Sequence, residues 1–142
     1  METFRVYECG GMSSLDWDSQ NAWRESAKEW LEHLECNYKV KVINPCSYFN
    51  FKTVNHRSER EVMNFDLNQV RSSNLILVNF NDPRSIGSAV ELFVAYENHI
   101  PVIGYCKDKD TIIHPWLLEY VDRMCLDLKD SLKYIANFYL LA

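Results

Sequence analysis

Leu75-Ile76-Leu77-Val78 is a continuous apolar run and the strongest indication of fold class in this chain. A strand with apolar side chains on both faces needs cover on both faces, which is typical of a parallel sheet between two layers of helices. Strand-like and helix-like segments alternate on either side of this run. The sequence therefore predicts a single α/β domain over residues 1–142, with a doubly wound, mainly parallel five-stranded sheet of the Rossmann or flavodoxin type and helices on both faces.

Five strands and five helices are expected along the chain. The expected strands cover residues 4–9, 40–43, 75–80, 102–105 and 123–126. The expected helices cover residues 19–35, 58–71, 86–98, a short piece after Pro115, and 128–140. Ser58 and Glu61 form a Ser-x-x-Glu capping box at the start of the second helix. In such a sheet, ligands bind beyond the carboxyl ends of the strands, so the loops that follow the strands are the place to look for a site.

The composition bounds the class of protein. A chain of 142 residues with 47% hydrophobic residues can bury a core without disulfide bonds or a structural metal. The net charge of -5 disfavours binding to long nucleic acids, which usually needs a basic surface, and leaves a single nucleotide possible as a ligand. We expect no nucleic-acid polymer and no membrane among the partners.

The cysteines indicate a reducing compartment. They are odd in number and never form a Cys-x-x-Cys pair, which argues against a disulfide framework and against a zinc site. The five are Cys9, Cys36, Cys46, Cys106 and Cys125. The first residues lead directly into a strand pattern without a signal peptide, and no apolar run approaches the length needed to cross a bilayer. We therefore expect a cytoplasmic protein with no metal.

The expected helix over residues 86–98 carries a carboxylate in its middle. Its core-facing row is expected to consist of Ile86, Val90, Phe93 and Val94. Glu91 lies in a neighbouring row between Gly87 and Ala95, two residues without bulk that would leave the acid in a small hollow. Burying an unpaired carboxylate is costly, so a buried Glu91 indicates a function. The structural alternative is a solvated glutamate on the flank of the helix.

Two further residues are candidates for the same chemistry. Asp66 lies between Phe65 and Leu67 on a helix that must pack on the sheet, and aspartate is a poor residue for the middle of a helix. A ligand hydroxyl would suit its carboxylate. Tyr7 lies near the end of the first strand, where its phenol can point toward the carboxylates, although a core or interface tyrosine is the commoner case.

The start of the helix over residues 86–98 offers hydrogen-bond donors. Ser85 can cap this helix, and Ser85, Gly87 and Ser88 together present free amides and hydroxyls that suit a phosphate or a ribose hydroxyl. Gly10, Gly11 and Met12 follow the first strand in a turn that would let backbone amides approach a ligand. This turn matches neither Gly-x-Gly-x-x-Gly nor a P-loop, and a tight strand-to-helix turn is its structural alternative.

Taken together, these segments resemble the nucleoside 2-deoxyribosyltransferase family and the related deoxynucleoside 5'-monophosphate N-glycosidases. The similarity covers most of the chain through the order and spacing of its pieces. The pieces are Val6-Tyr7-Glu8-Cys9-Gly10-Gly11-Met12, Val42-Ile43-Asn44-Pro45, Asn64-Phe65-Asp66-Leu67-Asn68, Ser85-Ile86-Gly87-Ser88-Ala89-Val90-Glu91-Leu92, Pro101-Val102-Ile103-Gly104 and His114-Pro115-Trp116.

The resemblance implies a mechanism without metal or organic cofactor. Glu91 would be the nucleophile that attacks C1' of a nucleoside and forms a covalent glycosyl-enzyme, as in retaining glycosidases. Tyr7 would orient Glu91, and a phenol beside C2' favours a 2'-deoxy sugar over ribose. Asp66 would lie near the sugar and the leaving base, where it either helps to protonate the base or holds a hydroxyl. Gly10, Gly11 and Met12 would contribute to the substrate site.

The chain departs from the family at two positions. Several transferases carry an acid six residues before the nucleophile, where it holds the sugar 5'-hydroxyl, whereas this chain has Ser85, as the nucleotide hydrolases do. A serine accepts a 5'-phosphate that an acid would repel. Arg24, Arg57 and Arg84 are candidates for an arginine contact to that phosphate. The second departure is Asn74, where many relatives have an aspartate, and we expect it to affect packing.

Three functions follow from these observations. The first is cleavage of the N-glycosidic bond of 2'-deoxynucleosides, with transfer of the sugar to another nucleobase, in nucleoside salvage. The second is hydrolysis of nucleoside 5'-monophosphates, and the third is a binding module without turnover. The expected partners are a nucleoside or nucleoside monophosphate, a free nucleobase and a second copy of the chain, which the apolar tail over residues 138–142 could contact. Base preference would depend on aromatic residues that could either stack on a base or pack: Tyr48, Phe49, Phe51 and Trp116.

Overall fold

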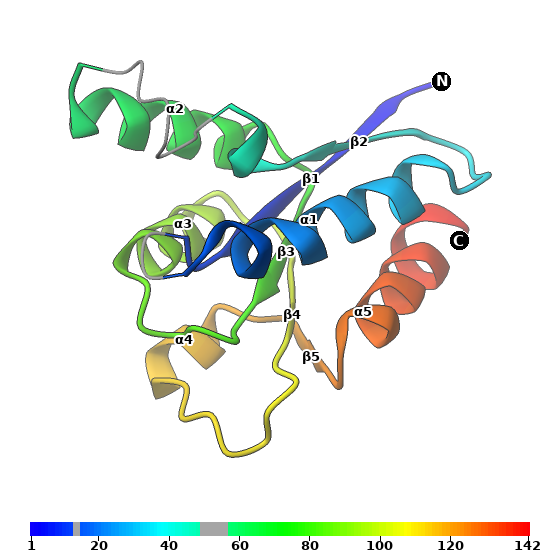
Figure 1. Ribbon diagram of the computed structural model, residues 1–142. Helices are drawn as coiled ribbons and strands as arrows, with labels where there is room; N and C mark the ends of the chain where they lie inside the picture. Colours follow the sequence, from blue (N-terminus) through cyan, green and yellow to red (C-terminus); the bar gives the residue numbers. More distant parts are fainter. Residues whose placement is uncertain (13–14, 49–56) are drawn as a thin grey trace.

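A five-stranded parallel sheet forms the centre of the computed structural model (Figure 1). The structure describes residues 1–12, 15–48 and 57–142. The strands are β1 (Thr3–Gly10), β2 (Lys39–Ile43), β3 (Leu75–Asn79), β4 (Val102–Tyr105) and β5 (Arg123–Cys125). Their order is β2-β1-β3-β4-β5 and every pair is parallel, which confirms the predicted flavodoxin-type sheet.

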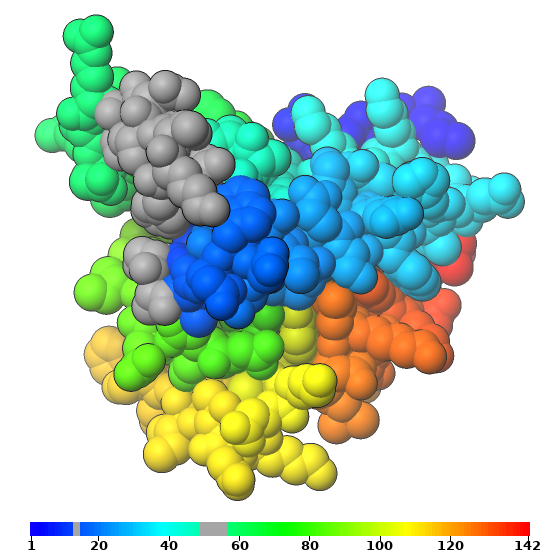
Figure 2. Space-filling model, viewed as in Figure 1, coloured from blue at the N-terminus to red at the C-terminus, as the bar shows by residue number. Residues whose placement is uncertain are grey.

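Helices cover both faces of the sheet, as predicted (Figure 1). One face carries α1 (Trp17–Glu32), α5 (Leu128–Ile135) and the π-helical continuation η2 (Ala136–Leu140). The other face carries α2 (Glu59–Arg71), α3 (Ile86–Glu97) and the short α4 (Pro115–Glu119). A 3-10 turn, η1 (Pro45–Ser47), follows β2. Figure 2 shows the blue α1 and the orange α5 side by side on the face turned toward the viewer.

Ser58 caps α2 as predicted, because its hydroxyl accepts a hydrogen bond from the amide of Glu61. The Glu61 side chain turns back to Ser58 as in a capping box, but its Oε1 accepts from the Ser58 hydroxyl at 3.1 Å. Asn74 makes two hydrogen bonds to Arg5 of β1. The Asn74 amide donates to the Arg5 carbonyl at 2.8 Å, and the Arg5 amide donates to Asn74 Oδ1 at 2.8 Å. These bonds hold the start of β3 against β1. Asn74 therefore contributes to strand pairing, in agreement with the packing role expected for it.

The predicted core-facing row of α3 is wrong for three of its four residues, whereas Val94 packs against the core. Ser88, Leu92 and Ala95 are the buried residues of this helix. Ile86 is 81% exposed, and Val90 and Phe93 also lie on the outside. The helix carries apolar residues on almost every side, so its pattern does not distinguish one face from another. Contact with β1 selects the row with the small residues, because a helix can approach a sheet most closely there.

β1 presents opposite chemistry on its two faces. Tyr7 and Cys9 point toward the α2 and α3 side, whereas Val6 belongs to the core under α1 and α5. Glu8 lies on the same side as Val6, is fully buried, and its two carboxyl oxygens have no hydrogen-bond partner among the described residues. Burial raises the pKa of the Glu8 carboxyl well above its usual range, an effect that the nearby Arg24 charge opposes in part.

Glu8 is expected to make the fold less stable as the pH rises. Below the pKa of the unfolded state both states are protonated, and above it only the unfolded state releases its proton easily, so the free energy of unfolding falls with rising pH. Glu8→Gln removes this cost and should be more stable than wild type at pH 8 by roughly 1 kcal/mol or more, with a smaller difference at pH 5. Urea unfolding of both proteins at the two pH values measures the difference. A variant less stable than wild type at pH 8 would show instead that an ionised Glu8 stabilises Arg24.

The order in which successive strands are added to the sheet reverses between β1 and β3. The connection through α1 leads from β1 outward to β2, and the connection through α3 leads from β3 outward to β4. Gly10 and Asn79, the last residues of β1 and β3, lie side by side. A ligand site in an open parallel sheet is expected beyond this pair of strand ends.

The described part of the chain contains no helix long and apolar enough to cross a membrane. The five cysteines are free thiols.

Candidate active site

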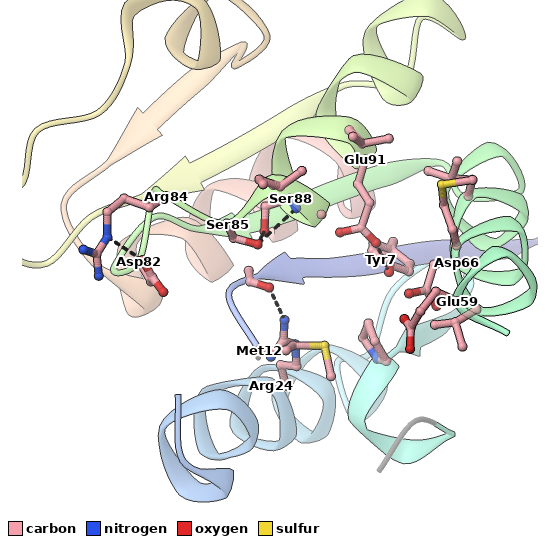
Figure 3. Close-up of a pocket in the computed structure, with 18 of the residues that line it drawn as sticks. Tyr7, Met12, Arg24, Glu59, Asp66, Asp82, Arg84, Ser85, Ser88 and Glu91 are labelled. Atoms are coloured by element: carbon pink, nitrogen blue, oxygen red, sulfur yellow. Dashed lines mark hydrogen bonds and ion pairs between the residues drawn. The ribbon is translucent and has the colours of Figure 1, made fainter. Parts of the chain in front are cut away.

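A cleft of about 830 Å³ opens beyond the carboxyl ends of β1 and β3, between α1, α2 and α3 (Figure 3). Eight of the nine residues predicted for the site line it: Tyr7, Gly10, Met12, Asp66, Ser85, Gly87, Ser88 and Glu91. The ninth, Gly11, lies directly behind the cleft wall against Asp82. The structure therefore brings together predicted site residues from three separate segments of the chain, namely 7–12, Asp66 and 85–91.

Glu91 extends from α3 toward β1, and its carboxylate meets two side chains there. The Tyr7 hydroxyl donates a hydrogen bond to Glu91 Oε2. The Cys9 thiol lies 3.5 Å from Oε1. Figure 3 shows Glu91 and Tyr7 pointing toward one another at the floor of the cleft. The Glu91 carboxylate is therefore oriented by Tyr7 and Cys9 and lines the cleft. Glu91 is not a solvated residue on the helix flank.

The surroundings of Glu91 favour its neutral form. Burial raises the pKa of the Glu91 carboxyl to about 7, the hydrogen bond from Tyr7 opposes this rise, and the Asp66 charge adds to it. A carboxyl group with a pKa raised to about 7 in a cleft is typical of groups that act as nucleophiles or as acids and bases.

Asp66 faces the cleft from α2, on the side of Tyr7 (Figure 3). The Tyr48 hydroxyl donates a hydrogen bond to Asp66 Oδ1 at 2.9 Å. Burial raises the pKa of the Asp66 carboxyl, while the bond from Tyr48 and the charge of Arg24 lower it. The Tyr48 ring packs edge-on against Phe65 at 4.9 Å, so its ring is held against α2 and not free to stack in the cleft.

Arg24 of α1 stabilises the glycine turn after β1 through hydrogen bonds to backbone carbonyls. The Arg24 guanidinium is fully buried and donates hydrogen bonds to the carbonyls of Glu8, Gly10 and Gln20. Gly11 has little room for a side chain, because a Cβ there would lie 3.1 Å from Cβ of Asp82, so Asp82 would have to shift by a few tenths of an ångström. The close approach of the Asp82 side chain therefore explains this glycine, and Met12 follows it at the edge of the cleft.

The amino terminus of α3 forms the far end of the cleft. Ser85 caps the helix by accepting a hydrogen bond from the Ser88 amide at 3.2 Å, and the Ser88 hydroxyl donates to Ser85 Oγ at 3.1 Å. Gly87 lies exposed between them. Arg84 pairs with the buried Asp82 at 3.5 Å and is otherwise exposed (Figure 3). This end of the cleft therefore carries both signs of charge beside a helix amino terminus.

Comparison with known proteins agrees with this architecture. No protein-family model matches the sequence, and no curated protein sequence matches it either. Among solved structures, it is similar to the 2-deoxyribosyltransferase of Bacillus psychrosaccharolyticus, with a TM-score of 0.73 and 16% identity over 96% of this chain and 97% of that one. It is similar to the 2-deoxyribosyltransferase of Leishmania mexicana, with a TM-score of 0.72 and 12% identity over 96% and 99%. The CMP N-glycosidase of Clostridium botulinum gives 0.58 and 14% over 94% and 98%.

The chain has the nucleoside 2-deoxyribosyltransferase fold. The resemblance inferred from the sequence is confirmed at the level of the fold.

Several residues of this deoxyribosyltransferase fold line the cleft although the sequence did not single them out. Asp82 follows β3 in an Asn-Asp-Pro segment and looks like an ordinary turn residue, yet its side chain is buried at the cleft. Glu59, Arg60 and Met63 contribute from α2. The position of Asp82 after the central strand was the available signal, because residues there reach the ligand end of the sheet.

Other candidates lie elsewhere. Trp116, weighed as a base-stacking residue, is 72% exposed and packs edge-on against His114, outside the cleft. Phe49 and Phe51 lie outside the described residues. Arg24 and Arg84 line the cleft, but Arg24 is committed to backbone carbonyls. Leu140 of the expected contact tail is fully buried in the chain's own core.

Proposed function

We propose that this protein cleaves the N-glycosidic bond of 2'-deoxynucleosides through a covalent deoxyribosyl intermediate on Glu91 and transfers the sugar to another nucleobase. The observation that carries the proposal is a carboxylate in the cleft, fixed by the Tyr7 hydroxyl, with a second carboxyl group, Asp66, beside it. The fold shared with two 2-deoxyribosyltransferases supports the same reaction class.

The first half-reaction replaces the bond between C1' and the base nitrogen with a bond between C1' and a Glu91 carboxylate oxygen. The electron pair of the broken bond goes to the base, which takes up a proton to leave as a neutral molecule. The oxocarbenium-like transition state is stabilised by the adjacent negative charge, which is lost when the ester forms. In the second half-reaction an incoming base nitrogen attacks C1' and Glu91 leaves as a carboxylate.

The polar residues that line the cleft form two groups, one at each end of it. The catalytic group Tyr7, Asp66 and Glu91 lies at one end, and the helix amino terminus with Ser85, Gly87 and Ser88 lies at the other. We propose that the sugar spans them, with its 5'-hydroxyl at the amino terminus of α3 and near Asp82. Asp82 would then hold the 5'-hydroxyl in place of the acid that several transferases carry at the position of Ser85.

A hydrolase of nucleoside 5'-monophosphates is the second candidate. Ser85 at the helix amino terminus and the exposed Arg84 favour it, because amides, hydroxyls and a guanidinium suit a 5'-phosphate. Asp82 at the same end opposes it, since it places a negative charge close to where the phosphate would lie. We therefore rank it second.

Product analysis tests the proposal. Deoxyinosine and, separately, dCMP or dGMP are incubated with the protein, each with and without free adenine, and the products are separated by chromatography. We expect deoxyadenosine from deoxyinosine only when adenine is present, and no deoxyadenosine with Glu91→Ala. Free base released from the monophosphates alone would favour the hydrolase. No Glu91-dependent product would leave a nucleotide-binding module as the better account.

A homo-oligomer remains a prediction. Apolar side chains are exposed on the neighbouring helices α2 and α3, including Met63 and Phe65 on one and Phe93 and Tyr96 on the other. A face of this kind supports contact with a second copy of the chain.

A further inference from the structure

The Cys9 thiol lies behind the Glu91 carboxylate and has two hydrogen-bond acceptors within reach. Cys9 follows Tyr7 by two residues on β1, so both side chains point to the same face of the sheet. Its Sγ lies 3.5 Å from Glu91 Oε1 and 3.8 Å from the Ser88 carbonyl oxygen, and the thiol can donate a hydrogen bond to either. A thiol carries a single proton, so it donates to one of these oxygens at a time.

Cys9 keeps its proton. Its side chain is fully buried and does not line the cleft, whereas Glu91 does. Burial raises the pKa of the Cys9 thiol well above its usual range, and the Glu91 charge raises it further. A buried, protonated thiol is not a nucleophile. Its role toward Glu91 is therefore that of a hydrogen-bond donor.

Each oxygen of the Glu91 carboxylate has its own donor from β1. Tyr7 donates to Oε2, and Cys9 reaches Oε1. An ionised carboxylate attracts the thiol proton more strongly than a neutral carbonyl does, because a hydrogen bond to a charged acceptor is the stronger one. When Glu91 is neutral, as a carboxylic acid or as an ester, this preference is lost and the Ser88 carbonyl is the alternative acceptor. The preferred partner of the thiol therefore depends on the charge of Glu91.

Sulfur suits a donor that changes its partner. A buried hydroxyl that loses its partner becomes an unpaired polar group, which is costly. A cysteine, in contrast, packs as a small apolar residue with a weak S–H donor. Cys9 belongs to the apolar cluster between the sheet and the helices α2 and α3. It can therefore turn from Glu91 to Ser88 at little cost in stability.

We propose that Cys9 is a positioning residue whose thiol donates to Glu91 Oε1 while Glu91 is ionised and turns to the Ser88 carbonyl when that charge is lost. The part of the inference that concerns catalysis rests on the proposed function. As C1' bonds to Glu91 in the first half-reaction, the thiol turns to Ser88. As the bond between C1' and Glu91 breaks in the second, the thiol returns and stabilises the released carboxylate. Only the S–H bond rotates, and no proton leaves the sulfur.

Other groups also act on the charge of Glu91. Burial raises its pKa most, the hydrogen bond from Tyr7 lowers it, the Asp66 charge of α2 raises it, and the Arg24 charge of α1 lowers it. Further charged residues line the same cleft: Glu59, Arg60, Asp82 and Arg84. A substitution at Cys9 leaves all of these groups in the protein, so it isolates the contribution of the thiol.

Infrared difference spectroscopy tests the change of partner in wild type without any substrate. An S–H stretching band moves to lower frequency when its hydrogen bond becomes stronger. We expect one S–H band to do so as the pH is raised through about 7, in the same step in which the Glu91 carboxylate forms. In Glu91→Gln, which stays neutral, no S–H band should move in this step. A wild-type spectrum in which no S–H band moves with Glu91 would overturn the inference, whether or not any Cys9 variant folds.

Carbon-13 NMR titration of the Glu91 carboxyl compares two variants of Cys9. Cys9→Ala removes the donor, and the pKa of Glu91 should rise by about half a pH unit or more. Cys9→Ser keeps a donor and should titrate closer to wild type than Cys9→Ala does. Cys125→Ala removes a buried thiol from the opposite face of the sheet and is the matched control, which should titrate like wild type. A Glu91 carboxyl that titrates identically in Cys9→Ala and wild type would contradict the hydrogen bond from the thiol.

Kinetics then test the catalytic part. Cys9→Ala should lower kcat/KM by about 3- to 10-fold at pH 6 and by less at pH 8.5, because the reaction needs ionised Glu91, and Cys9→Ser should recover part of this loss. An unchanged pH profile of Cys9→Ala would contradict the role of Cys9. If an S–H band moves with Glu91 but no deoxynucleoside is turned over, the proposed function fails and the change of partner stands. If turnover is observed but no S–H band moves, the inference fails and the function stands.

Discussion

Glu91→Gln is expected to lower kcat for deoxynucleoside cleavage by about 10⁴- to 10⁶-fold, the range found when an essential nucleophile is removed. Glutamine has nearly the same shape and can still accept a hydrogen bond from Tyr7. A neutral amide, however, neither attacks C1' to form an ester nor stabilises the positive charge of the transition state. Single-turnover cleavage of deoxyinosine, followed by release of hypoxanthine, measures the loss.

The stability of this variant separates chemistry from folding. Burial raises the pKa of Glu91 to about 7, so above that pH the folded protein carries a carboxylate that its surroundings disfavour. Glu91→Gln should therefore be at least as stable as wild type at pH 8. Glu97→Gln, at the exposed end of the same helix, is the matched control and should keep full activity. A Glu91→Gln protein with near wild-type activity would remove the nucleophile from the mechanism.

Tyr7→Phe is expected to give the second largest effect, and one that depends on pH. Tyr7 donates its hydrogen bond to Glu91 and so opposes the rise in pKa that burial causes. Without the hydroxyl, the pKa of Glu91 should move above about 7. The reaction needs ionised Glu91, so kcat/KM should fall by about 10²- to 10³-fold at pH 6 and by less at pH 8.5. A pH profile from pH 5 to 9 measures the shift.

A buried phenylalanine at position 7 should keep the packing of the core, because Tyr7 is fully buried among apolar neighbours. Tyr105→Phe provides the control, since Tyr105 is a buried tyrosine on the opposite face of the sheet. A profile of Tyr7→Phe that moves to lower pH, or does not move, would contradict the role of the Tyr7 hydroxyl.

The fold could be predicted because its signals are local. The apolar run of β3 requires cover on both faces, and Ser58 with Glu61 marks the start of α2 within four residues. The orientation of α3 could not be predicted in the same way. Its outer residues Ile86, Val90 and Phe93 are as apolar as its inner ones, so only the contact with the sheet determines which row is buried.

The site could be predicted to the extent that the topology determines it. Tyr7 lies within β1, Asp66 and Glu91 lie on the helices that follow β2 and β3, and a polar residue in an apolar segment marks each of them. Asp82 is marked only by its place after the central strand, in a segment that looks like an ordinary turn. Tyr48 was a candidate for stacking on a base, and its hydrogen bond to Asp66 joins distant segments, which sequence spacing does not encode. Glu8 carries the same mark as the site residues, because it is an acid within the buried part of β1, but it lies on the face of the sheet away from the cleft.

The most direct test of the account is the mass of the protein after brief incubation with a deoxynucleoside and no acceptor base, quenched in acid. We expect a fraction of the protein to gain the mass of one deoxyribosyl group. Peptide mapping should place this group on Glu91, and added adenine should remove it as deoxyadenosine forms. Base released with no adduct on Glu91 at any quench time, and undiminished in Glu91→Gln, would contradict a covalent mechanism on this residue.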